Sequence, residues 1–83
     1  MIKNKEIAQN ISELMLDFAE RLNKSLYEIK EKCSEEEFKK YRRGVSYILG
    51  NVSIVILNKL YEEHPDLKPK EYYLPGLSNT GED

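Results

Sequence analysis

Residues 44–57, Gly-Val-Ser-Tyr-Ile-Leu-Gly-Asn-Val-Ser-Ile-Val-Ile-Leu, decide how this chain folds, because they form its most apolar stretch and carry no charge. At helical periodicity the stretch has two apolar stripes on opposite sides. A helix of this kind needs cover on both sides, so the pattern predicts an assembly of helices. The stretch is shorter than the roughly 20 residues that span a bilayer. We therefore expect a buried helix and no membrane contact.

The composition fits one small helical domain. The chain has 83 residues, with Lys+Arg 13 against Asp+Glu 15 and a net charge of −2. A chain this short buries only about 60% of its unfolded surface, so further burial against a partner would stabilise it. The charge balance gives no general attraction to nucleic acid or anionic lipid. We expect a homodimer, with another protein as an alternative partner.

Cysteine and histidine each occur once, as Cys33 and His64. A single cysteine cannot form an internal disulfide, and no other Cys or His lies at metal-ligand spacing. We therefore expect no metal site, no cofactor and no catalytic residue, with His64 near the C-terminal end of a helix and Cys33 as a free thiol. The charged N-terminus lacks the apolar core of a secretory signal, which favours a cytoplasmic location.

Residues 3–32 are predicted to form the first helix, because they contain no Gly or Pro and their apolar residues recur every three or four positions. These residues are Ile7, Ile11, Leu14, Phe18, Leu22, Leu26 and Ile29, and Ala8, Met15, Ala19 and Cys33 widen the same side. The other side carries acid–base pairs four residues apart, which add a few tenths of a kcal/mol each. The pairs are Asp17–Arg21, Glu20–Lys24 and Glu28–Lys32.

Ser34 begins the second helix, because Glu37 follows it at the spacing of a capping box. The helix should run over residues 35–63, since Pro65 pushes His64 out of the helical region. The sequence thus predicts an all-α fold, a long antiparallel hairpin over residues 1–64. The alternatives are one continuous helix through Ser34, and a strand over residues 52–57, which are rich in β-branched side chains but have no second strand to pair with.

Two stripes run along the second predicted helix. The main stripe should face the first helix, and it comprises Phe38, Tyr41, Val45, Ile48, Val52 and Val55, with Leu49, Ile56 and Leu60 beside it. The second stripe lies opposite, where it predicts the interface of a dimeric four-helix bundle. That interface comprises Arg43, Tyr47, Gly50, Ile54, Leu57 and Tyr61. The glycine would allow a neighbouring helix to approach closely.

Residues 65–83 contain three prolines and lack helical periodicity, which predicts an extended strap with a frayed end. Apolar side chains in this tail are candidates for docking on the helices. They are Leu67, Tyr72, Tyr73, Leu74 and Leu77. The sequence leaves open whether this tail or a partner subunit covers the second stripe.

The favoured function is a non-enzymatic protein–protein interaction or regulatory module that acts as a homodimer. The alternative is a nucleic-acid-associated regulator that uses the basic residues Lys39, Lys40, Arg42 and Arg43. It is disfavoured because Glu35 and Glu36 stand four residues before Lys39 and Lys40, the spacing of surface ion pairs.

Glu20-Arg21-Leu22, with Lys32 eleven residues after Arg21, resembles the first helix of the small all-α chorismate mutases. The resemblance covers about a dozen residues, and no third helix is predicted to complete such a bundle. It implies an enzyme that uses Arg21 and Lys32, which is the last of the three hypotheses.

Overall fold

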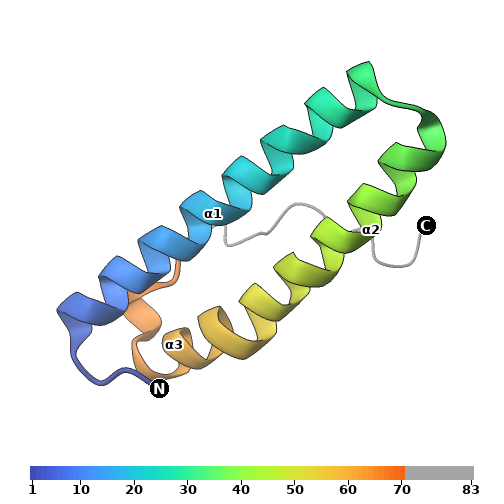
Figure 1. Cartoon of the computed structure of the whole chain (residues 1–83). Coiled ribbons are helices and arrows are strands. Elements are labelled where there is room, and N and C mark those ends of the chain that lie inside the picture. The colour runs from blue at the N-terminus through green and yellow to red at the C-terminus, as the bar shows by residue number, and fades with distance from the viewer. Residues whose placement is uncertain (71–83) are drawn as a thin grey trace.

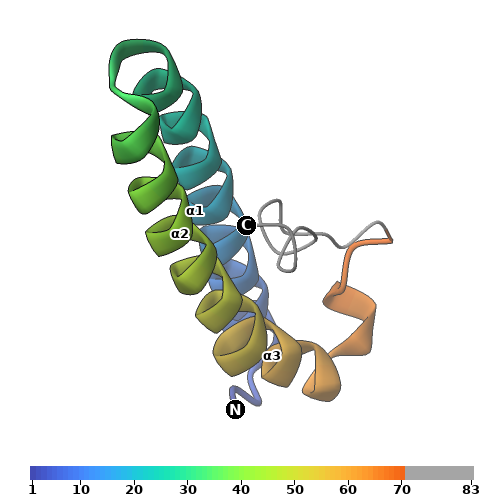
Figure 2. The ribbon, with the colours of Figure 1, turned by 90° about the vertical axis from the view of Figure 1, so that its right-hand side faces the viewer.

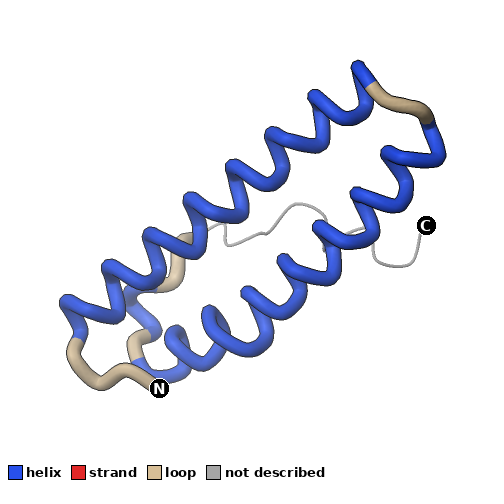
Figure 3. Tube along the Cα trace, viewed as in Figure 1, coloured by secondary structure: helices blue, strands red, loops and turns tan. Residues whose placement is uncertain are grey.

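The computed structural model describes residues 1–70 as an all-α hairpin (Figure 1). The elements in order are α1 (Lys5–Lys32), α2 (Glu35–Asn51), the π-helix η1 (Val52–Leu57), α3 (Asn58–Glu63) and the 3-10 turn η2 (Pro65–Leu67). The helices α1 and α2 pack antiparallel, and no strand occurs within residues 1–70 (Figure 3). The predicted all-α hairpin is confirmed. The strand over 52–57 and the continuous helix through Ser34 are both wrong.

Local capping sets the ends of the first helix. The side chain of Asn4 accepts a hydrogen bond from the backbone N–H of Ile7 at 3.1 Å, so α1 begins at Lys5. At the other end Cys33 has an extended backbone, with φ −124° and ψ 171°, which separates α1 from α2. The chain can therefore reverse direction without a glycine or proline.

The turn is held by the predicted capping box. The Ser34 hydroxyl accepts a hydrogen bond from the Glu37 N–H at 3.1 Å, and the Glu37 carboxylate accepts one from the Ser34 N–H at 2.9 Å. The hydrogen bond from the Ser34 N–H to the carboxylate is the main cause that lowers the pKa of Glu37. The box satisfies two backbone donors that the start of α2 would otherwise leave open.

Replacing Ser34 by alanine should therefore destabilise the protein by about 1 kcal/mol, because the Glu37 N–H loses its acceptor. Chemical denaturation at fixed protein concentration measures the change. Glu36→Gln, one residue before Glu37 and outside the box, is the control and should change stability by less than about 0.5 kcal/mol. Equal losses in the two variants would contradict a structural role for the box.

Small residues form the contact side of α1. Ala8, Ser12 and Ala19 are buried there, whereas Ile7, Leu14 and Phe18 remain exposed to between 40% and 55%. Small side chains at a helix contact let the two helices approach closely. Ile7, Leu14 and Phe18 consequently lie on a flank of α1, whereas Ile11, Leu22 and Leu26 pack against the core.

Leucines from the second half of the hairpin fill the core. Leu49, Leu57 and Leu60 are the largest fully buried side chains among residues 1–70, and Val45 and Val52 lie beside them. The main stripe is therefore correct at Val45 and Val52, whereas Ile48 between them is 43% exposed. Beyond that residue the buried side of the helix changes.

The change occurs at the π-helix η1, where the N–H of Asn58 bonds the carbonyl of Ser53, five residues earlier. A π-turn accommodates one more residue than an α-turn, so the following residues rotate relative to an uninterrupted helix. Leu57 and Tyr61 consequently face the core, and Val55 is 52% exposed. The straight continuation of the main stripe to Val55 is wrong for this reason.

Two hydroxyl pairs connect the helices. Ser12 and Tyr61 hydrogen-bond at 2.6 Å in the core, and Ser25 and Tyr41 do so at 2.6 Å nearer the turn. Each pair satisfies polar atoms that would be costly to bury alone. Together they fix how far α1 is shifted along the second helix.

The open end of the hairpin is closed by the first residues of the chain. The carbonyl of Ile2 lies 2.7 Å from Nε2 of His64, and the N-terminal ammonium donates to Glu63 at 2.6 Å. That ammonium lowers the pKa of Glu63, and Lys5 lowers the pKa of Asp66 in the same way. Beyond α3 the chain turns sharply into η2 (Figure 2).

Within residues 1–70, one helix, Glu35–Glu63, is long and apolar enough to cross a membrane by length and composition alone. Core helices pass the same test, and 39% of its most apolar window is buried in the hairpin.

Candidate interaction surface

The π-helix divides the residues of the second stripe. Tyr47 and Ile54 point outward, with 75% and 65% of their surface exposed, and Gly50 is partly buried. Leu57 and Tyr61 belong to the core, where they contribute to the packing of one chain. Leu57 and Tyr61 are therefore not part of the outward surface, because η1 turns them toward α1.

A groove runs between the two long helices on one side of the hairpin. Leu14, Phe18 and Leu22 line it from α1, and Tyr41 lines it from α2. Its volume is about 370 Å³, and Asp17 and Arg21 also line it. Leu14 and Phe18 of α1 therefore lie on the same side of the hairpin as Tyr41 of α2.

Apolar residues continue the groove along both helices. Ile7 lies seven residues before Leu14, and Ile48 lies seven after Tyr41, so each pair projects from one side of its helix. Val55, a further seven residues on, lies within η1, which turns the helix, so this spacing does not extend to it. We call this surface the apolar face, and its residues are Ile7, Leu14, Phe18, Tyr41 and Ile48. All of these residues belong to stripes that were predicted to be buried within the hairpin.

Gly44 lies on the same side of α2, between Tyr41 and Ile48. A Cβ atom built at Gly44 would meet nothing within 4 Å among the described residues. Glycine inside a helix costs up to about 1 kcal/mol relative to alanine, and the contacts within the described part of this chain do not require it here. The apolar face therefore lacks a side chain at Gly44, where another backbone could approach closely.

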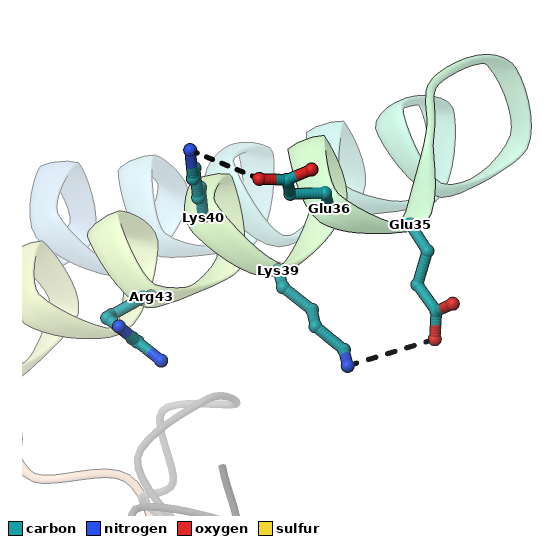
Figure 4. A pocket seen from close by; sticks show the side chains of 5 residues that line it. All are labelled: Glu35, Glu36, Lys39, Lys40 and Arg43. Carbon is teal, nitrogen blue, oxygen red and sulfur yellow. Dashed lines mark ion pairs between the residues drawn. The ribbon is translucent and has the colours of Figure 1, made fainter.

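Three of the basic residues after the turn, Lys39, Lys40 and Arg43, share one hollow with two acidic residues. Lys39 pairs with Glu35 at 3.9 Å, and Lys40 pairs with Glu36 at 3.5 Å, as expected from their spacing (Figure 4). Arg43 lies along the same hollow. Acidic neighbours thus offset both lysines of the candidate nucleic-acid patch.

Arg42 points to another part of the surface, where it lies 5.9 Å from the centroid of the Phe38 ring. Lys30 of α1 lies at the same distance from that ring, 5.9 Å. The two cations cover the half-buried ring near the turn, an arrangement that is favourable by about 0.5–1 kcal/mol at an exposed site. Arg42 therefore lines a second hollow, which shares Glu35 and Lys39 with the one that Arg43 lines.

The residues of the enzyme hypothesis are not brought into one site. Arg21 lines the groove, while Lys32 pairs with Glu28 at 3.6 Å near the turn. Cys33 is an exposed free thiol. No group of three metal-ligating side chains occurs in the described part of the chain.

The tail residues can be followed only in part. Leu67, in η2, packs against the hydrophobic core. The remaining tail-docking residues, Tyr72, Tyr73, Leu74 and Leu77, lie outside the described residues.

Comparisons with protein-family models, with curated proteins and with solved structures give no match for this chain. The apolar face is the candidate interaction surface of the described residues.

Proposed function

We propose that the protein is a non-enzymatic interaction module that works as a homodimer and uses the apolar face for contact. The observation that carries this proposal is the exposure of large apolar side chains along both helices on one side of the hairpin, with Ile48 43% and Leu14 55% exposed. Contiguous apolar surface of this kind marks protein or membrane interaction sites in small proteins.

The dimensions support a stable contact. The described chain extends 44 × 22 × 20 Å, so one long side offers an area comparable to the ~800 Å² that each partner buries in a standard interface. Two hairpins packed face to face would form a four-helix bundle, in which the apolar residues of both chains share one core. We therefore propose the apolar face as the contact, in place of the second stripe.

Ile48→Lys should weaken the dimer at least about 100-fold, because the new cation would be buried without a partner in the interface. Sedimentation equilibrium over a concentration series measures the dissociation constant. Tyr27→Lys is the matched control, since Tyr27 is 74% exposed and lies outside the apolar face. It should leave the dimer unchanged, and both variants should retain the helical circular dichroism of the wild type.

Two results would contradict the proposal. A wild type that stays monomeric at high concentration and sediments with phospholipid vesicles would assign the face to a membrane. A dimer that survives Ile48→Lys but is lost in Ile54→Lys would return the interface to the second stripe.

A further inference from the structure

Two opposite charges line the groove on either side of Phe18. Asp17 and Arg21 are one helical turn apart, the spacing at which they could pair with each other. Within residues 1–70, however, neither of them takes part in an ion pair. An acid and a base thus stand exposed beside the apolar face, where an occupant of the groove would meet both.

A second copy of this chain would satisfy both charges at once. In a two-fold interface, if one residue contacts a second residue of the partner, then the reciprocal contact also forms. We propose that two copies dock through the apolar face across a two-fold axis that passes beside Phe18 and Ala19. The α1 helices then run antiparallel, and Asp17 of each copy pairs with Arg21 of the other. This inference rests on the proposed function and specifies its geometry.

The position of the axis also suits the length of α1. The helix runs from Lys5 to Lys32, so its midpoint falls between Phe18 and Ala19. An axis at this point overlays the two α1 helices along their whole length. The register that pairs the charges is therefore also the one that buries the most helix surface.

Other arrangements do not use the charges in this way. If the α1 helices packed in parallel about the same point, Asp17 would face Asp17 and Arg21 would face Arg21. Like charges opposed across an interface are unfavourable by several kcal/mol. The antiparallel two-fold arrangement is the one that converts this charge pattern into attraction.

Complementary charge reversal tests the geometry. In Asp17→Arg the new cation faces Arg21 of the other copy, and in Arg21→Asp the new acid faces Asp17 of the other copy. Each variant alone should therefore dimerise at least about tenfold more weakly than the wild type at low salt. In an equimolar mixture every contact is again between opposite charges, so a heterodimer should form with an affinity within about threefold of the wild type.

Sedimentation equilibrium measures the three affinities, and native mass spectrometry identifies the heterodimer. Both substitutions are on exposed positions of α1, so circular dichroism should show unchanged helix content. Single variants as dimeric as the wild type, or a mixture that remains monomeric, would overturn the two-fold geometry. In those cases a dimer that is still lost in Ile48→Lys would keep the proposed function. A monomeric wild type would overturn both.

Discussion

Replacing Leu57 by alanine should destabilise the protein by about 2–5 kcal/mol, while the same replacement at Ile54 should change its stability by less than about 0.5 kcal/mol. Leu57 is 0% exposed and packs in the core, so its removal leaves a cavity between the helices. Ile54, three residues earlier, is 65% exposed. For a small domain whose total stability is a few kcal/mol, the first change would leave a large fraction of molecules unfolded.

The contrast between the two variants depends on the π-helix. In an uninterrupted helix both residues would belong to the second stripe, and both would point away from α1. Urea denaturation at one fixed protein concentration gives the free energies of unfolding without a contribution from mass action. Similar effects of Leu57→Ala and Ile54→Ala, or a larger loss at Ile54, would mean that residues 52–57 are α-helical.

Periodicity and capping were sufficient to predict the hairpin. The apolar repeat of the first helix, the capping box at Ser34 and the proline after His64 are local signals, and each acts within a few residues. They correctly predicted two long antiparallel helices. Their positions along the chain follow from the same signals, apart from the start of α1, which the Asn4 cap moves to Lys5.

The buried side of the second helix beyond Val52 could not be predicted in the same way. Both stripes are apolar there. The helix would therefore bury a similar amount of apolar surface whether the main stripe or the second stripe faced α1. The observed rotation is the one that places Leu57 in the core and brings the hydroxyl of Tyr61 to Ser12. That hydrogen bond joins residues far apart in sequence, and it depends on a register that no local pattern contains.

The apolar face was missed for a related reason. Sequence periodicity shows that Leu14 and Phe18 share a side of α1, but it does not show which flank of each helix lies on which side of the hairpin. Burial of Ala8 and Ala19 at the contact moves the bulkier residues outward. A useful signal would have been the alternation of small and large residues along α1, because small residues mark where helices approach most closely.

Deleting Ile54 should leave the protein folded, although it removes a residue from the middle of a long helix. The π-helix contains one residue more than an α-helix needs over the same turns, so the deletion allows residues 52–57 to become α-helical. Leu57, Leu60 and Tyr61 would then keep their orientation toward α1. We expect a change in stability of less than about 1 kcal/mol, because the lost side chain is mostly exposed.

The control is deletion of Lys24 in α1, which contains no π-turn that could absorb the change. Every residue before or after the deletion would rotate by about 100° relative to the rest of the helix, which removes one half of α1 from its contact with the second helix. We expect this chain to lose its cooperative unfolding transition. Thermal unfolding followed by circular dichroism compares the two deletions. If deletion of Ile54 unfolds the protein as deletion of Lys24 does, the core needs the extra residue of η1 in order to form. The view that the π-helix only absorbs an additional residue would then be wrong.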